Sequence, residues 1–165
     1  LIERVVTVSG QSFVNKGNFL TRIGTPLKQL VDLAGGITDE TAKVIVGGPM
    51  MGKAVADLDI PVTKGTSGLI DIVRQVAYRK PSHTCIRCGK CITACPMGLE
   101  PYLFMTLTQY GQWDKLEAHH IMDCIECGCC TYSCPSNRPL LDYLKWGKSQ
   151  VGNRIRSRQK VSNHE

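Results

Sequence analysis

Apolar residues in the first part of the chain recur with the periods of strands and of one helix. The β-branched runs at residues 5–8 and 44–46 are each closed by glycine and predict two strands. A helix is predicted between them, with Thr25-Pro26 as N-cap and first helical residue and Gly35-Gly36 as its end. Its apolar face is made by Leu27, Leu30, Val31 and Ala34. Strands around one short helix predict a small α+β domain over residues 1–62.

The pattern changes after this segment. Residues 63–84 carry glycine and proline at short intervals and predict a connector, in which residues 69–73 fit either a strand or the start of a helix. Further along, Pro101 and Pro139 each predict the start of a helix. A short helix between those two is predicted to present one apolar side, made by Trp113, Leu116 and Ile121. Residues 148–165 are polar and basic and predict a mobile tail.

Cysteine is the outlier of the composition. The 165 residues include nine cysteines, all of them between positions 85 and 134. The odd number, and the absence of a secretion-signal pattern in the first residues, favour metal binding in a reducing compartment over a disulfide scaffold. No apolar run approaches the roughly 20 residues that span a bilayer. Because the chain does not begin with Met, we expect it to be a fragment of a longer protein.

The net charge is less informative than its value suggests. It is formally +6, but residues 145–165 contain six lysines and arginines against one glutamate and so contribute +5. The remainder of the chain is therefore close to neutral. There is no basic stripe with interleaved aromatic residues, so we predict no nucleic-acid partner.

Eight of the cysteines form two copies of the motif Cys-x2-Cys-x2-Cys-x3-Cys-Pro. The copies begin at Cys85 and Cys124, an offset of 39 residues, and share an isoleucine and a glycine at matching positions. Three cysteines at this spacing can curl around one face of a cubane of four irons and four sulfides, where Gly89 and Gly128 allow a tight or left-handed backbone. The fourth cysteine of such a run cannot easily close on the same cube, and in two-cluster proteins it ligates the other cluster.

The motifs therefore predict two [4Fe-4S] clusters with crossed ligands. The first cluster is assigned to Cys85, Cys88, Cys91 and Cys134. The second cluster is assigned to Cys124, Cys127, Cys130 and Cys95. Two such clusters form a path for electrons, and no catalytic residue is predicted.

The cysteines have other possible roles. Structural zinc uses pairs of Cys-x2-Cys, commonly with twelve or more residues between the pairs, and two tandem triplets with a trailing Cys-Pro do not fit that spacing. Clusters with a purely structural role are a second alternative. Cys129 lies outside the motif, and we interpret it as a small buried or free thiol, with ligand exchange or redox sensing as the alternative.

Three features in order resemble the RnfC family, a subunit of the Rnf ion-translocating electron-transport complex. They are the string Gly47-Gly48-Pro49-Met50-Met51-Gly52, the segment 59–68 (Asp-Ile-Pro-Val-Thr-Lys-Gly-Thr-Ser-Gly) and the two cysteine motifs. The resemblance spans about residues 3–148. The ferredoxin-type motif alone is common to many proteins, and its combination with the first string is far more specific.

The resemblance implies a fold and a function. It implies a small β-grasp domain of the soluble-ligand-binding (SLBB) type over residues 1–62, then a mostly helical two-cluster ferredoxin domain over residues 85–147. It implies electron transfer within an NADH/ferredoxin oxidoreductase that moves Na⁺ or H⁺ across a membrane. The protein would be peripheral, on the cytoplasmic side of the cell membrane, with other Rnf-type membrane subunits and a ferredoxin-linked redox partner.

The same resemblance implies that NAD and FMN bind in a region before the β-grasp domain, so no nicotinamide or flavin site is assigned to this chain. Two other functions remain open at this point. One is the electron-transfer part of a soluble NADH-dependent reductase, such as a cobalamin reductase. The other is a scaffold module that its clusters merely stabilise.

Overall fold

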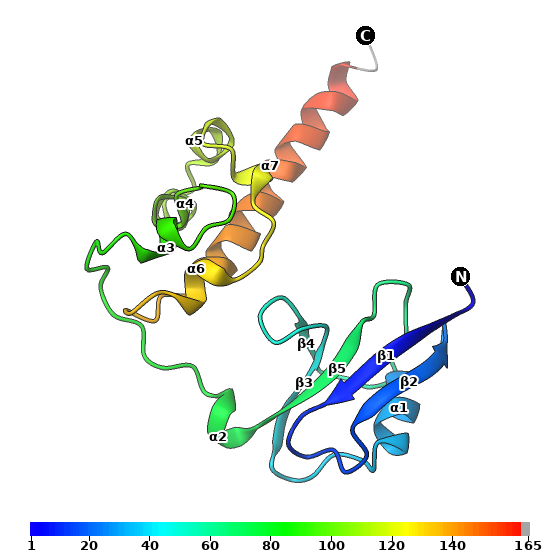
Figure 1. Cartoon of the computed structure of the whole chain (residues 1–165). Coiled ribbons are helices and arrows are strands. Elements are labelled where there is room, and N and C mark those ends of the chain that lie inside the picture. The colour runs from blue at the N-terminus through cyan, green and yellow to red at the C-terminus, as the bar shows by residue number, and fades with distance from the viewer. Residues whose placement is uncertain (163–165) are drawn as a thin grey trace. The chain divides into compact units, whose positions relative to one another are not determined.

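The computed structural model describes residues 1–162 and divides into two compact units (Figure 1). The first unit runs from Leu1 to Arg79, and the second begins at Lys80. The first is built around a sheet and the second from helices, so the α+β class expected from the sequence is confirmed. Each unit has its own hydrophobic core.

The first unit is a five-stranded mixed sheet covered by one helix (Figure 1). Its strands are β1 (Glu3–Ser9), β2 (Gly17–Arg22), β3 (Thr41–Val46), β4 (Lys53–Val55) and β5 (Gly68–Val73). They lie in the order β2-β1-β5-β3-β4, in which β1 and β5 are parallel and the other pairs antiparallel. Helix α1 (Leu27–Leu33) packs on the sheet, and the short α2 (Arg74–Ala77) follows β5.

Alternation along β1 explains how this unit closes its core. Val6 and Val8 are fully buried whereas Val5 is half exposed, because successive side chains of a strand point to opposite faces. The buried pair meets Leu27 and Leu30 of α1 in a single cluster. Each fully buried aliphatic side chain of this kind contributes about 1.5–3 kcal/mol through the hydrophobic effect.

The predicted boundary at residue 62 is wrong. Residues 69–73, which the sequence left open between strand and helix, lie in β5 at the centre of the sheet, with β1 on one side and β3 on the other. The first unit therefore continues to Arg79, and most of the predicted connector belongs to it. A central strand is buried on both faces, so it lacks the polar–apolar alternation that identifies a strand in a sequence.

The second unit consists of short helices around one long helix (Figure 1). They are α3 (Lys90–Thr93), α4 (Pro101–Gln109), α5 (Trp113–Ala118), the 3-10 turn η1 (Ile121–Asp123), α6 (Cys129–Tyr132) and α7 (Leu140–Ser162). The helices predicted after Pro101 and Pro139 are present. The predicted helix with one apolar side stops at Ala118, and Ile121 reaches the core from η1 instead.

The predicted mobile tail is wrong for residues 148–162, which continue α7 without a break. Val151 is fully buried, and Ile155 packs against the same core. Ion pairs tie the helix to α5: Arg154 lies 3.1 Å from Asp114, and Arg158 contacts Glu117. Apolar residues four apart within a basic segment put one stripe on the core, which the overall polarity of the segment concealed. Residues 163–165 lie outside the part that the structure describes.

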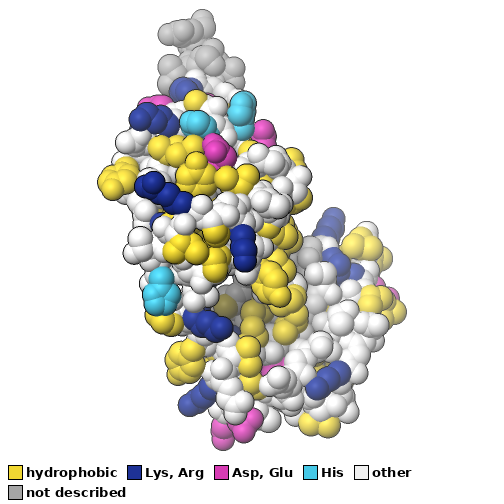
Figure 2. Space-filling model, turned by 60° about the vertical axis from the view of Figure 1, so that its left-hand side comes forward, with side chains coloured by type: hydrophobic (Ala, Val, Ile, Leu, Met, Phe, Trp, Pro, Cys, Tyr) yellow, Lys and Arg dark blue, Asp and Glu magenta, His cyan; other side chains and the backbone are white. Residues whose placement is uncertain are grey.

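The surface of the molecule is mixed in character. On the face in Figure 2, lysine and arginine side chains are interspersed with apolar, acidic and uncharged ones. Within residues 1–162, every helix is too short or too polar to cross a lipid bilayer.

Candidate metal centres

The sequence repeat is also a repeat of the backbone. Helices α3 and α6 occupy identical positions in the two copies, since Lys90–Thr93 and Cys129–Tyr132 are offset by 39 residues at both ends. Pro101 and Leu140, the first residues of α4 and α7, are related by the same offset. Positive φ angles recur in three matched pairs, namely Arg87 with Glu126, Gly89 with Gly128 and Gly98 with Asn137.

The turn before each short helix has a local cause. Gly89 and Gly128 are the N-cap residues of α3 and α6, with left-handed φ angles of 75° and 83°. The Gly89 carbonyl accepts hydrogen bonds from the amides of Ile92 and Thr93, and the Gly128 carbonyl is used in the same way one repeat later. Glycine adopts this conformation without a Cβ penalty, so the chain can curl between the second and third cysteines of each motif.

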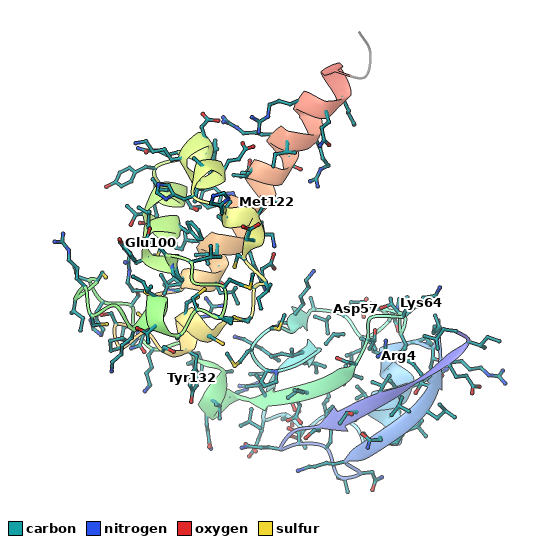
Figure 3. The ribbon with its side chains drawn as sticks, turned by 45° about the horizontal axis from the view of Figure 1, so that its top comes forward. Arg4, Asp57, Lys64, Glu100, Met122 and Tyr132 are labelled. Carbon is teal, nitrogen blue, oxygen red and sulfur yellow. The ribbon has the colours of Figure 1, made fainter. Side chains whose placement is uncertain are left out.

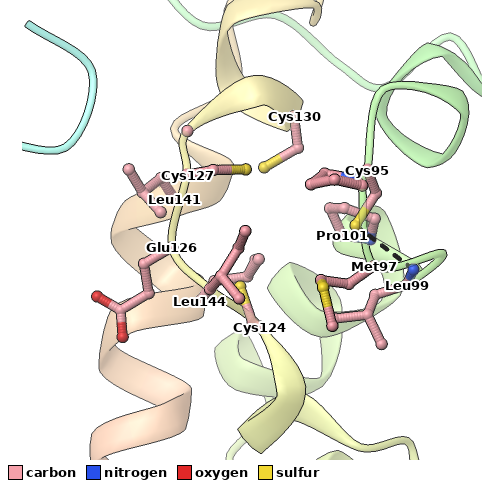
Figure 4. A pocket seen from close by; sticks show the side chains of 13 residues that line it. Cys95, Met97, Leu99, Pro101, Cys124, Glu126, Cys127, Cys130, Leu141 and Leu144 are labelled. Carbon is pink, nitrogen blue, oxygen red and sulfur yellow. Dashed lines mark hydrogen bonds between the residues drawn. The ribbon is translucent and has the colours of Figure 1, made fainter.

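Four cysteines line one hollow, called here the second hollow (Figure 4). They are Cys95, Cys124, Cys127 and Cys130, the set assigned to the second cluster. Three come from the second motif, whereas Cys95 is the last cysteine of the first. The amide of Leu99 donates a hydrogen bond of 3.4 Å to the Cys95 sulfur. Leu141 and Leu144 of α7 contribute apolar lining.

The other four motif cysteines line a separate hollow, the first hollow. They are Cys85, Cys88, Cys91 and Cys134, the set assigned to the first cluster. The empty space is about 2350 Å³ here against about 340 Å³ in the second hollow, so the first is much wider and more open. Its lining is also more polar and includes His83, Arg87 and Gln109.

The arrangement suits a multi-iron cluster. All nine cysteines are free thiols, so no disulfide links the two motifs. Within residues 1–162, no three Cys, His, Asp or Glu side chains converge on a point that one metal ion could occupy. A cubane carries four separate irons, so its cysteines surround a volume and need not converge on a point. Two hollows with four cysteines each meet that requirement.

Burial controls the protonation of several of these thiols. Burial raises the pKa of Cys130 to about 11, because a thiolate is poorly solvated there. The pKa of Cys91 and that of Cys124 are also raised by burial, partly offset by hydrogen bonds from the backbone. Iron binds thiolate, so metal must displace these protons, and metal binding is coupled to proton release.

Cys129 stands apart from both sets. It begins α6 and does not line the second hollow, although its neighbour Cys130 does. A hydrogen bond with the side chain of Cys127 is the main cause that raises the pKa of Cys129. The ninth cysteine is thus close to a motif cysteine without facing the space that the motif cysteines share.

Comparison with known proteins assigns the two units. An SLBB domain model matches residues 5–54, and a 4Fe-4S dicluster domain model matches residues 84–138. The order of the two domains is that expected from the sequence. The dicluster match contains all eight motif cysteines.

Relatives carry both domains in one chain. The chain is 43% identical over 151 residues to the RnfC-type protein of the proton-translocating ferredoxin:NAD(+) oxidoreductase complex of Clostridium ljungdahlii, a match that covers 91% of this chain and 33% of that protein. The counterpart from the Na(+)-translocating complex of Acetobacterium woodii is 41% identical over 151 residues, 92% of this chain and 34% of that protein. This chain is an RnfC homologue. The RnfC-type protein of the ion-translocating oxidoreductase complex of Yersinia enterocolitica is 41% identical over 152 residues, 92% of this chain and 22% of that protein.

The RnfC homologue thus spans about a third or less of the length of these three relatives. One residue beside its second hollow was missed by the sequence analysis. Lys148 of α7 donates to the Cys124 carbonyl, and its Nζ lies 3.5 Å from Glu126 Oε1. The sequence analysis placed Lys148 in the tail. The offset of 39 could have found it, because it pairs Lys148 with Gln109 on the lining of the first hollow.

Proposed function

We propose that this chain carries electrons through two [4Fe-4S] clusters. The first cluster is held by Cys85, Cys88, Cys91 and Cys134, and the second by Cys124, Cys127, Cys130 and Cys95. One observation carries the proposal: each hollow gathers three cysteines of one motif and the last cysteine of the other. The dicluster domain match over residues 84–138 supports it independently.

When bound, such clusters accept and donate single electrons without making or breaking bonds in a substrate. The protein side of this function is ligation, orientation and control of solvent. Leu141 and Leu144 keep the second hollow apolar, and the amide of Leu99 supports the Cys95 sulfur through a hydrogen bond. Hydrogen bonds to sulfur and exclusion of water are two of the means by which a protein sets the reduction potential of a cluster.

The larger role is proposed from the relatives. Their names place them in ion-translocating ferredoxin:NAD(+) oxidoreductase complexes. We infer that this segment passes electrons inside such a complex, beside other membrane subunits and a ferredoxin-linked redox partner. It would lie peripherally on the cytoplasmic side of the cell membrane. NAD and FMN would bind in the part of the RnfC protein that this chain does not match, so the segment is an electron carrier with no substrate site of its own.

Pairs of cysteine substitutions test the crossed ligation. The protein is reconstituted anaerobically with iron and sulfide, and its iron content and EPR spectrum are measured. Wild type is expected to hold about eight irons, four for each cluster. Cys91→Ala with Cys134→Ala removes two ligands of the same cluster, so about four irons and one EPR signal should remain. Cys91→Ala with Cys95→Ala removes one ligand from each cluster, so both signals should change.

The matched control is Cys129→Ala, which should keep about eight irons because Cys129 does not line the hollow. Uncrossed ligation would reverse the two double variants: the Cys91 and Cys95 pair would then spare one cluster. A wild-type protein with about four irons or fewer would contradict the proposal itself. Retention of the loaded protein with membranes that contain the remaining subunits would test its place in the complex.

A further inference from the structure

The two hollows are related by a repeat, but their charges differ at equivalent positions. Arg87 lines the first hollow and Glu126 the second, and the two residues are 39 positions apart. Their φ angles are 56° and 57°, so the backbone is nearly the same at both sites. Each residue directly precedes the second cysteine of its motif. The repeat therefore keeps the geometry and reverses the sign of the charge.

Two further matched pairs extend the difference. Lys90 begins α3 where the uncharged thiol Cys129 begins α6. Gln109 lines the first hollow, and its counterpart Lys148 forms an ion pair with Glu126. At these three positions, the first hollow carries Arg and Lys, a charge of +2. The second carries Glu and Lys, a charge of zero, because the ion pair neutralises itself.

This difference bears on electron affinity. Reduction adds one negative charge to a cluster, so nearby positive charge favours the reduced form and raises the reduction potential. Arg87 and Lys90 are exposed or half-buried, and salt weakens their effect, but they lie on the hollow or immediately beside its ligands, well within a Debye length of about 8–10 Å.

Solvent access differs in the same direction. Cys88 in the first hollow is exposed, whereas Cys130 in the second is buried. The second hollow is narrow and largely apolar in its lining, and the first is wide with polar residues. A site with more water stabilises the more highly charged reduced cluster better than a dry site does. Charge and solvent access thus agree on which hollow favours the extra electron.

We propose that the cluster at the first hollow has the higher reduction potential and that Arg87 and Lys90 set much of the difference. This inference rests on the proposed function, because it presupposes two clusters. The transfer it describes is one electron: the cluster at the second hollow is oxidised, the cluster at the first is reduced, and no bond or proton changes place. Electrons that enter the pair therefore collect at the first hollow, beside the exposed Cys88.

A redox titration followed by EPR tests the assignment. Wild type reconstituted with two clusters should show two separate midpoint potentials. The variant Arg87→Gln/Lys90→Gln should lower the higher midpoint and leave the lower one in place. We expect at least a tenfold change in the distribution of one electron between the clusters, which corresponds to about 59 mV for a one-electron couple. The conservative variant Arg87→Lys/Lys90→Arg should keep the wild-type separation.

The matched control is Lys16→Gln/Lys28→Gln, which removes the same charge from exposed positions of the first unit and should move neither midpoint. Glu126→Gln provides an opposite test: it should raise the lower midpoint and also narrow the gap. Coincident wild-type midpoints, or an Arg87/Lys90 variant that shifts the lower midpoint, both midpoints equally or neither, would overturn the inference. Those results leave two clusters in place, so they are distinct from a chain with about four irons or fewer, which overturns the proposed function first.

Discussion

Gly147 of α7 lies against Thr108 of α4 so closely that a Cβ built on Gly147 would come within 2.5 Å of Thr108 Oγ1 (the helices are drawn with their side chains in Figure 3). The two residues are 39 positions apart and are therefore equivalents in the repeat. A contact between equivalents marks the approximate two-fold axis that relates the halves of the second unit. The glycine thus sets how closely α4 and α7 approach, and these helices follow the last cysteine of each motif.

Gly147→Ala should destabilise the second unit. The new methyl group would also meet Ile121 at 3.0 Å and Leu116 at 3.2 Å, so the packing around it must shift. Overpacking of this kind costs about 1–3 kcal/mol, which exceeds the gain of about 1 kcal/mol from replacing a helical glycine by alanine. The measurement is the thermal unfolding midpoint of the cluster-loaded protein.

The matched control is Gly152→Ala on the same helix. A Cβ there meets nothing closer than 3.7 Å, so the helix-propensity gain should raise the midpoint. If Gly147→Ala were as stable as Gly152→Ala, α4 and α7 would not be in the close contact described.

A second substitution should relieve the first. The Thr108 hydroxyl is buried and has no hydrogen-bond partner within the described residues, so Thr108→Ala removes an unsatisfied group and opens space beside Gly147. The double variant Thr108→Ala/Gly147→Ala is expected to be more stable than the sum of the single effects by about 0.5–3 kcal/mol. A double-mutant cycle of thermal unfolding measures this coupling, and strict additivity would contradict it.

The contents of the two cysteine sets could be predicted from spacing alone, and so could the glycine turns. The reason is that a cluster imposes its geometry on a short, contiguous motif. Pro101 likewise identified α4, because proline suits the first helical turn. Local chemistry of this kind is visible in the sequence without knowledge of the rest of the fold.

What the sequence could not provide depended on distant partners. Residues 69–73 became a strand because β1 and β3 flank them, and no local signal states that. The segment after residue 147 became helix because Val151 and Ile155 find the core, and because Arg154 and Arg158 find α5. In both cases tertiary contacts decided between structures that local propensity left open.

Asp71→Ala should destabilise the first unit. Asp71 on β5 is 3% exposed, and its Oδ2 accepts hydrogen bonds from the amides of Ser12 at 2.9 Å and Gln11 at 3.2 Å. Hydrogen bonds to a charged acceptor contribute about 1.5–3 kcal/mol each, so a loss of about 3 kcal/mol or more is expected. Amide hydrogen exchange across the sheet measures it, because protection there reports local stability.

The control for that experiment is Asp39→Ala, an exposed aspartate of the same unit, which should change stability by less than about 0.5 kcal/mol. Equal protection in the two variants would mean that the Asp71 carboxylate does not hold the loop of residues 11–12.

Val151→Ala tests whether the end of the chain is part of the second core. Val151 is fully buried against residues such as Leu144, so truncation leaves a cavity and should cost about 1–3 kcal/mol. Ser149→Ala, two residues earlier and exposed, should be neutral within about 0.5 kcal/mol. Equal thermal midpoints for the two variants would return the segment to the mobile tail that the sequence suggested.

Iron removal should separate the two units in their response. The second unit places its cysteines in the same cluster of packed residues as Phe104 and Leu140, so loss of the metal removes ligand bonds from its core. The first unit has an independent core with no cysteine, and its sheet needs no metal. Chelation under reducing conditions should therefore abolish slow amide exchange in α4 and α7 and leave it unchanged in β1 and β5. A parallel loss of protection in β5 would show that the first unit depends on the clusters for its folding.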